Sequence, residues 1–393
     1  MRSLGLPKIT LEGLCYVATL SFLLAGALVR QINLLLVLFA LLASLPLLNW
    51  WLVRQNLRRL TLQRRLPRSV ASGDVLMVEL ELANPRRRLA SWAARVDDRI
   101  CRQDDGATEE PILAQALFAY VPARGARTQS YRGRLMRRGR YRFGPLRIST
   151  QFPFGLMRGS VTIEQPQTML VLPRLGRLTR RWQRLQQSSD LGTSNVERRQ
   201  GLLEGDFYGL RDWRQGDSRR WIHWRTSARR QAPVVRQFEQ QRNQDLALVV
   251  ELWQPDRPSA FHSAQVELAV SFAASIVSDV CRRGGRTLWI SVAARTPRFD
   301  SGPASLALTR EVMESLAVAE ATSTDALPNA LSKILDVARP GTNAIVISTR
   351  SVDLSDTERF ATLWRNTRQR AWLGRLQAID VGRSDLADYF VPL

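Results

Sequence analysis

The segment LEGDFYGLRDWRQGDSRRWIHWRTSARRQAPVVRQFEQQR (Leu203–Arg242) separates a membrane-like and strand-patterned N-terminal part of this 393-residue sequence from an α/β-patterned C-terminal part. This Arg/Trp segment is dense in Arg, Asp, Gly and Trp; its tryptophans are Trp213, Trp221 and Trp224. Arginine suits bidentate pairing with carboxylates and stacking on aromatic rings. The segment therefore predicts either an internal clasp of paired charges or a docking face for an anionic partner. Because buried charges must be paired, the clasp is favoured.

Two apolar runs, Leu11–Val29 and Leu34–Val53, open the chain. Each approaches the ~20 residues that cross a bilayer as a helix. The first run resembles a signal peptide in length, but no small-residue cleavage pattern separates it from the second. Trp50 and Trp51 lie where an interfacial aromatic belt is expected. The arginines that follow are Arg54, Arg58, Arg59, Arg64, Arg65 and Arg68. The positive-inside rule then predicts a transmembrane hairpin with both ends in the cytoplasm, rather than two buried core helices.

Residues 66–173 change to a period of two. Val75–Leu82 alternates and ends at Asn84-Pro85, as a strand followed by a turn does. Further strand-like runs are Trp92–Asp97, Leu117–Val121, Thr128–Leu135, Gly139–Ile148 and Met169–Leu172. Short strands between turn residues predict an antiparallel β-sandwich-like domain, a binding or spacer module. We expect the two aromatics of Phe152–Met157 to plug the sheet, and the polar stretch from Arg174 to Gly201 to be a mobile connection.

Residues 246–393 show alternating strand and helix patterns. Leu246–Leu252 is a continuous apolar run, typical of a strand buried on both faces, and Ser263–Arg283 has helical spacing and ends at Gly284-Gly285. Further strands are expected at Thr287–Val292, Asn343–Ser348 and Leu376–Asp380, and helices at Ser305–Ala319, Ala326–Val337 and Asp356–Arg370. The pattern predicts a parallel sheet with helices on both faces. The chain thus divides into 1–65 (hairpin), 66–173 (β), 174–245 (linker and Arg/Trp segment) and 246–393 (α/β).

Composition narrows the possible functions. The formal net charge is +22, from 57 Lys and Arg against 35 Asp and Glu. Such a charge raises nucleic acid or an anionic membrane surface as partners, but its spread along the whole chain weakens the nucleic-acid case. The three cysteines are far apart, which argues against a disulfide framework, and two histidines without a CxxC or HExxH motif indicate no zinc site.

We find no catalytic constellation and no phosphate-binding loop in the sequence, so we expect no enzyme activity and no cofactor. His223, between Trp221 and Trp224, is expected to be packed rather than catalytic. The acidic pairs Asp104-Asp105 and Glu109-Glu110 are expected in a solvated loop.

Three strings resemble the bacterial domain-of-unknown-function 58 family: GDFYGLRDWRQGDSRRWIHWRTSARR in the Arg/Trp segment, RGRYRFGPLRI at 138–148, and FPFGLMR at 152–158. The residues proposed as its interaction or structural signature are Gly205, Arg211, Gly216, Asp217, Arg220, Trp224, Ala228, Arg229 and Arg242. The resemblance implies two membrane helices, a β-rich domain and a C-terminal von Willebrand factor A-like domain. It also implies a location in the bacterial inner membrane and a partner of the MoxR-type AAA+ ATPase class.

Two positions depart from the family pattern. His223 stands where the family often has an acid, and Glu251-Leu252-Trp253-Gln254-Pro255 stands where a metal-binding A-like domain needs Asp-x-Ser-x-Ser. Hard oxygen ligands hold Mg²⁺, and both hydroxyl positions are missing here. We therefore expect no metal site at Glu251.

Three functional hypotheses remain. The first is a membrane-anchored scaffold or adaptor that binds the lipid bilayer, an ATPase and other protein clients, without a specific nucleic acid or small-molecule substrate. The second is a basic membrane-surface or nucleic-acid-binding protein, and the third is an envelope-related hydrolase with an unrecognised site. On the clasp hypothesis, Asp217→Ala or Arg220→Ala should destabilise the soluble part by ~3–5 kcal/mol, as the loss of a buried pair does.

Overall fold

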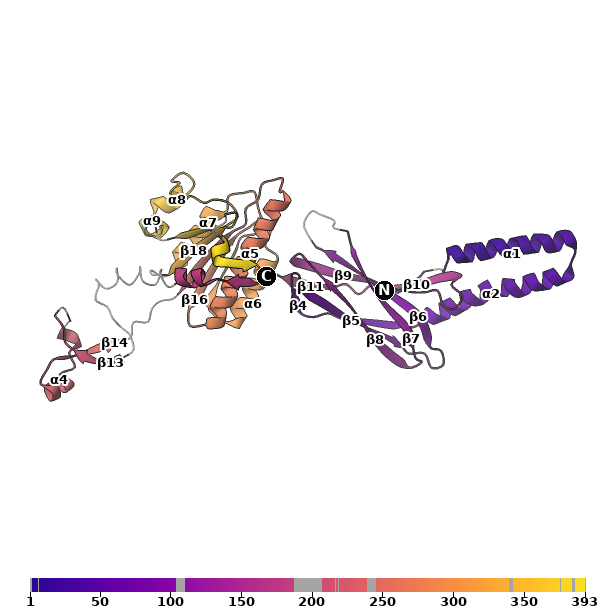
Figure 1. The fold of residues 1–393 in the computed structure, drawn as a ribbon, viewed down its shortest axis with the longest axis horizontal. Coiled ribbons are helices and arrows are strands. Elements are labelled where there is room, and N and C mark those ends of the chain that lie inside the picture. Colours follow the sequence, from indigo (N-terminus) through magenta and orange to yellow (C-terminus); the bar gives the residue numbers. More distant parts are fainter. Residues whose placement is uncertain are drawn as a thin grey trace. The chain divides into compact units, whose positions relative to one another are not determined.

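The structure is a computed structural model that describes residues 2–5, 7–103, 110–186, 207–215, 217, 219–238, 245–338, 342–374, 376–383 and 386–392. The chain forms two compact units, Met1–Arg174 and Leu175–Leu393, each described below by itself (Figure 1). All three cysteines are free thiols. Most of the acidic loop predicted at 104–110 lies outside the described residues; Glu110 is exposed.

The two apolar runs are helices, as predicted: α1 (Leu11–Arg30) and α2 (Asn33–Leu57). Thr10 caps α1 by accepting a hydrogen bond from the amide of Gly13, and Gln31 turns the chain in the left-handed conformation at φ 50°. Both helices are long and apolar enough to cross a membrane. Helix α5 (Ala260–Arg283) also meets that criterion, but 72 % of its apolar window is buried, so it is a core helix of the second unit.

The strands of the first unit form two sheets. The larger contains β1 (Arg2–Leu4), β2 (Lys8–Ile9), β4 (Ser69–Ala71), β6 (Ser91–Arg102), β7 (Ile112–Val121), β9 (Gly139–Thr150), β10 (Met157–Ile163) and β11 (Gln167–Leu172). The smaller contains β3 (Thr61–Arg65), β5 (Val75–Asn84) and β8 (Gly125–Arg134). Only the β4–β11 pair is parallel among the described pairings of these sheets. The strand-rich pattern of residues 66–173 is therefore confirmed.

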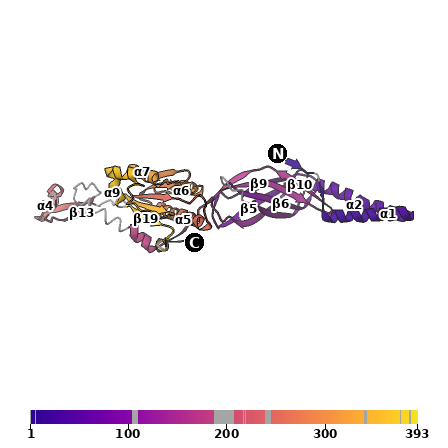
Figure 2. The same cartoon turned by 90° about the horizontal axis from the view of Figure 1, so that it is seen from above.

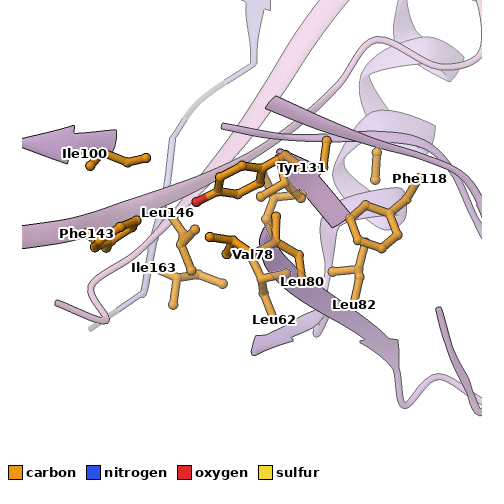
Figure 3. Packing of buried hydrophobic residues seen from close by; sticks show 14 of the residues in the cluster. Leu62, Val78, Leu80, Leu82, Ile100, Phe118, Tyr131, Phe143, Leu146 and Ile163 are labelled. Carbon is orange, nitrogen blue, oxygen red and sulfur yellow. The ribbon is translucent and has the colours of Figure 1, made fainter. Parts of the chain in front are cut away.

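Both sheets contribute to one hydrophobic core. Alternate residues of β5, from Leu76 to Leu82, are buried as the period of two predicts. They pack with side chains of the larger sheet, including Phe118, Phe143 and Ile148. Figure 3 shows Tyr131 and these phenylalanines among the aliphatic side chains of this core.

A buried ion pair lies inside this core. The side chains of Arg64 and Asp98 are both 0 % exposed and meet at 2.7 Å. The other Asp98 oxygen accepts a hydrogen bond from the hydroxyl of Tyr131 at 2.7 Å. Burial, together with the charge and hydrogen bond of Asp98, raises the pKa of Tyr131 above its ordinary range. Arg64 was expected to be one of the cations flanking the membrane, but it points into the core because β3 begins at Thr61 and places it on the inner face.

The FPFG turn does not plug the sheet: Phe152 and Phe154 are 38 % and 48 % exposed. Its backbone instead contacts the ends of the helical hairpin. The Phe154 amide donates to Asn49 Oδ1 at 3.3 Å, and Thr10 Oγ1 donates to the Gly155 carbonyl at 2.7 Å. The prediction was wrong because the turn lies beyond the end of β9, where Thr10 before α1 and Asn49 of α2 bind its backbone.

Glycines allow this close approach between the hairpin and the β-sheet. A Cβ on Gly13 would lie 2.1 Å from the Leu156 carbonyl oxygen, and one on Gly159 would lie 2.5 Å from Val53. Both distances are below van der Waals contact. The helical hairpin is therefore packed directly against β10 and the preceding turn.

The second unit contains a five-stranded sheet in the order β17-β16-β15-β18-β19. Its bounds are β15 (Leu246–Glu251), β16 (Thr287–Ala293), β17 (Arg298–Pro303), β18 (Asn343–Ser348) and β19 (Gln377–Asp380). All pairs are parallel except β16–β17, which is antiparallel. The edge strand β17 was not predicted from the sequence. Helix α7 (Leu327–Val337) packs on β15 and β16, and Figure 2 shows α7 and α5 on opposite sides of the sheet. The prediction of strands alternating with helices is confirmed, with α6 at Leu306–Ala317.

Two stretches of this unit differ from the prediction. The helix expected at Asp356–Arg370 is interrupted at Asn366, whose backbone is extended, giving α8 (Ala361–Arg365) and α9 (Thr367–Leu373). The start of the expected linker is folded: β12 (Gly176–Leu178) pairs with β20 (Phe390–Pro392), which follows α10 (Leu386–Tyr389). Trp182 is fully buried, with its ring 5.4 Å from that of Phe272 on α5. The buried Trp182 anchors residues 176–186 to the unit. The polar residues around Trp182 in the sequence gave no indication of this anchor.

We predict that Asp98→Ala destabilises the first unit by ~3–5 kcal/mol, because it leaves the Arg64 guanidinium buried without its counterion. Urea titration of the full chain in detergent, followed by protease resistance of the Met1–Arg174 unit, measures the loss. Asp97→Ala is the matched control: this neighbour forms a surface pair with Arg95 at 3.2 Å, and such pairs contribute ~0–1 kcal/mol. Equal midpoints for the two variants would contradict the prediction.

Candidate interaction site

The Arg/Trp segment folds around a two-stranded hairpin. Strand β13 (Phe207–Asp212) pairs antiparallel with β14 (Val234–Phe238), and between them lie η1 (Arg219–Trp221) and α4 (Trp224–Arg230) (Figure 1). Val234 and Val235 of β14 are both buried. Ser227 on α4 accepts a hydrogen bond from the Val234 amide at 2.8 Å, which ties the helix to the strand. Gly205, Gly216 and Arg242 of the predicted signature lie outside the described residues.

Arg211 and Asp217 form a two-pronged ion pair. Both guanidinium NH groups lie 2.7 Å from the two carboxylate oxygens, and the Arg214 amide donates to Asp217 Oδ2 at 2.8 Å. The hydrogen bonds from Arg211 and from the Arg214 backbone lower the pKa of Asp217 below its ordinary value. The pair is at the surface, with 37 % of the Arg211 side chain and 16 % of the Asp217 side chain exposed. The expectation that Asp217 belongs to a buried pair was therefore wrong. Asp217 instead pairs with Arg211 and closes the surface turn of residues 211–217.

His223 is the N-cap of α4. Its Nδ1 accepts from the Thr226 amide at 3.3 Å and lies 2.8 Å from the Thr226 hydroxyl. Aspartate is a preferred residue at an N-cap because its side-chain oxygen accepts the same hydrogen bond. The His223 imidazole therefore supplies the N-cap hydrogen bond of α4.

Several aromatic, apolar and cationic side chains of the segment are exposed. Trp224 is 70 % exposed, Trp213 38 % and Leu210 39 %. The exposed arginines of the segment are Arg214, Arg219, Arg220, Arg225, Arg229, Arg230 and Arg236. Ala228, one helical turn after Trp224, is also exposed, so α4 presents a small residue beside the indole. We call these side chains the Arg/Trp face.

A second polar cluster lies at the carboxyl end of the central strand β15. Glu251 is 2 % exposed, and its Oε1 accepts hydrogen bonds from Arg350 at 2.6 Å and from Arg359 at 3.1 Å. Its Oε2 accepts from the Ser348 hydroxyl at 2.5 Å. The same two arginines reach Asp325, each at 2.7 Å. Two carboxylates and two guanidinium groups therefore neutralise one another at this sheet edge.

This Glu251 cluster occupies the position at which open α/β sheets bind ligands, beyond the carboxyl ends of the strands. Burial acts to raise the pKa of Asp325, but the hydrogen bond and charge of Arg359 and the charge of Arg350 outweigh it and hold that pKa below the ordinary value. Arg350 also stacks 5.0 Å from the ring centre of Trp253. Within the described part of the chain, no group of three His, Cys, Asp or Glu side chains is arranged to hold a metal ion.

Residues 209–370 match the family described as "Protein of unknown function DUF58". The chain therefore contains a DUF58 region. It is also similar to the uncharacterized protein YeaD of Bacillus subtilis strain 168, at 28 % identity over 158 residues. That match covers 40 % of this chain and only 37 % of the relative's length.

Solved structures show only remote similarity. A CARDB domain from Pyrococcus furiosus matches 29 % of this chain and 87 % of its own length at 12 % identity and a TM-score of 0.18. A β-glucosidase from Listeria innocua matches 29 % of this chain and 16 % of its own length at 15 % identity and a TM-score of 0.20. A superoxide reductase from Ignicoccus hospitalis matches 28 % of this chain and 79 % of its own length at 12 % identity and a TM-score of 0.19. Similarity at this level supports no conclusion about function.

The DUF58 region contains both the Arg/Trp face and the whole Glu251 cluster. The structure joins Arg211 to Asp217 and places Trp224, Ala228 and Arg229 on α4. Sequence reasoning missed Asp325, Arg350 and Arg359, because they are 25 to 108 residues from their partners. The available signal was Glu251 itself, an acid at the end of a fully apolar strand, which needs a cationic partner when buried.

Removal of the Asp217 carboxylate should loosen the 211–217 turn without changing global unfolding. We expect Asp217→Ala to lower the hydrogen-exchange protection of the Arg214 amide, which loses its acceptor. Because the pKa of Asp217 is depressed, its contribution is present above the unfolded carboxyl pKa of about 3.9 and is lost as pH falls through the lower folded value. Asp212→Ala, at an 82 % exposed side chain, is the control. Unchanged Arg214 protection in Asp217→Ala would refute this assignment.

Glu251→Gln should lower the stability of the α/β unit by about 1.5–3 kcal/mol, since hydrogen bonds to two charged groups are weakened. The control is Glu320→Gln, which removes an exposed pair with Arg295 at 3.4 Å.

We also expect Mg²⁺ to leave the urea midpoint of the unaltered chain unchanged, because guanidinium and hydroxyl groups occupy the Glu251 oxygens. A midpoint that rises with Mg²⁺ would mean that a metal displaces these groups.

Proposed function

We propose that this DUF58 chain is a non-enzymatic, membrane-anchored adaptor whose Arg/Trp face binds an acidic surface of a protein partner. The partner class implied by the family resemblance is a MoxR-type AAA+ ATPase, acting with the chain in the assembly or maturation of protein complexes. The observation that carries the proposal is Trp224, an indole left 70 % exposed among arginines on a folded element.

The composition of the Arg/Trp face supports recognition of a protein. Trp and Arg are enriched among the residues that dominate binding energy at protein interfaces. Among the described residues of the segment, Asp212 is exposed and lies 4.0 Å from Arg230, and Arg214, Arg219, Arg225, Arg229 and Arg236 are exposed as well. The surplus of positive charge suits an acidic surface and speeds its association.

The two apolar helices supply the anchor. Their length, their hydropathy and the basic residues that follow α2 support two membrane crossings with both soluble units in the cytoplasm, at a bacterial inner membrane. Arg54, which lies over the ring of Trp50 at 5.6 Å, marks the boundary between apolar and basic sequence on α2.

The α/β unit supports a von Willebrand factor A-like assignment through its central parallel strands and its helices on both faces. Domains of that class with a metal bind partners through the ion. In this chain the equivalent strand end, Glu251, is held by Arg350 and Arg359, so we place partner recognition on the Arg/Trp face instead.

Trp224→Ala should weaken partner capture by about 30-fold, the effect of losing a hot-spot residue worth ~2 kcal/mol or more. Membranes containing the tagged full chain are solubilised, and co-purifying proteins are quantified by mass spectrometry, with an AAA+ ATPase expected as the main partner. The matched control is Phe261→Ala, which removes an aromatic ring that is 64 % exposed outside the segment.

Three results would count against this proposal. An unchanged set of partners in Trp224→Ala would exclude the Arg/Trp face as the docking site. Nucleic acid as the main co-purifying species, with affinity falling steeply as salt rises, would favour the nucleic-acid-binding alternative. Turnover of an envelope polymer by the purified chain would favour the hydrolase alternative.

A further inference from the structure

A cavity of about 280 Å³ opens on the outer face of the larger sheet of the first unit. It lies where β6 begins and β9 ends, close to the base of the helical hairpin. Its lining residues are Ala93, Arg95, Asp97, Leu117, Ser149, Thr150, Gln151, Phe152 and Arg158. Ala93 adopts a positive φ of 47° and interrupts the pairing of β6 with β7.

The polar lining of the cavity consists of two arginines, Gln151, Asp97 and the hydroxyl groups of Ser149 and Thr150. Arg158 is steadied by Gln151, whose amide oxygen accepts from two of its nitrogens at 2.6 and 2.7 Å once the amide is oriented for hydrogen bonding. Arg95 gives one N–H to Asp97 at 3.2 Å. A guanidinium has five N–H donors, so both arginines retain donors for a ligand. Lys8 is paired with Arg158 across β2 and β10 and adds a third cation beside the cavity.

An aromatic cluster borders the same cavity. The ring of Trp92 is stacked on that of Phe152 at 5.9 Å and lies 4.5 Å from that of Tyr120. The three side chains are 46 %, 38 % and 40 % exposed, respectively. Exposed aromatic rings with polar edges are typical of the interface between membrane and water.

Hydrogen bonds fix the height of this cluster along α2. Asn56 holds the backbone of Trp92 through its side-chain amide, at 2.7 and 2.9 Å, and its nitrogen also reaches Thr150 at 3.2 Å. Asn49 accepts from Phe154. These two asparagines are seven residues apart, or about 10 Å along a helix, and Trp50 lies between them. The cavity is therefore within about 10 Å of the expected aromatic belt, close to the headgroup layer, which is ~5–8 Å thick on each side of a bilayer.

We propose that this cavity binds the phosphate group of an anionic phospholipid, with Arg95 and Arg158 as the phosphate ligands and the Trp92 cluster against the glycerol and upper acyl region. Arginine pairs with phosphate in a two-pronged geometry, and cations near a membrane attract anionic lipid. The inference rests on the proposed membrane anchor, and it adds a specific lipid contact made by the β-sheet rather than by the helices.

The experiment uses the full chain in detergent micelles and titrates short-chain phosphatidylglycerol, phosphatidylcholine and inorganic phosphate, with retained lipid counted by native mass spectrometry. We expect phosphatidylglycerol to bind at least tenfold more tightly than phosphatidylcholine. The double variant Arg95→Gln/Arg158→Gln should lose this preference. Arg95→Lys/Arg158→Lys, which keeps the charge without the planar fork, should retain part of it.

Arg132→Gln/Arg134→Gln is the matched control, because it also removes two exposed cations from the same unit. β8 begins at Gly125 and ends at Arg134. Arg132 lies ~24 Å along the strand from Gly125, so both control residues are near the C-terminal end of β8. Equal losses in both double variants, no loss in either, or inorganic phosphate binding as tightly as the lipid would overturn the proposal. Carbonate extraction of native membranes distinguishes failure of the membrane anchor from failure of the lipid site. Release of the unaltered chain by carbonate would refute the anchor. Retention in the membrane without a preference for phosphatidylglycerol would refute only the lipid site.

Discussion

The Arg64 guanidinium is buried among the two sheets of the first unit, and every contact it makes ties together parts of the chain that are far apart in sequence. It bonds Asp98 on β6, Gln167 on β11, and the carbonyls of Phe143 and Gln165. A buried charge without such partners costs several kcal/mol. These partners come together only when β3, β6, β9 and β11 are in register, so other arrangements of the sheets would leave the Arg64 charge buried without them.

The same Arg–carboxylate chemistry recurs at two other depths. In the Glu251 cluster the carboxylate is buried, while Arg350 and Arg359 are 25 % and 17 % exposed. In the Arg/Trp segment the Arg211–Asp217 pair lies at the surface. As exposure rises, the contribution of a pair to stability falls, because water competes for both ions. The surface pair is thus suited to shape a turn that presents side chains, and the buried ones to hold a fold.

Local patterns were predictable, whereas the partners of charged residues were not. The alternation of Val75–Leu82 and the apolar run from Leu246 gave correct strands, because burial imposes a period of two on a half-buried strand and a continuous run on a fully buried one. Arg64 lies in a cluster of arginines, and nothing local indicates that it is buried while Arg65 is 67 % exposed. The docking of the FPFG turn on Thr10 and Asn49 also depends on contacts more than 100 residues apart.

The Arg/Trp segment shows why a dense charge pattern is hard to interpret from sequence. Its arginines outnumber its acids, so a fully paired clasp would require acids from elsewhere in the chain. Among the described residues, Asp217 bonds Arg211 and the Arg214 backbone, and Asp212 is 82 % exposed, 4.0 Å from Arg230. Trp224 and the arginines next to it on α4 are exposed, so the proposed partner would have to bring both carboxylates and an apolar contact. An acidic protein surface supplies both together, and this favours a docking face over an internal clasp.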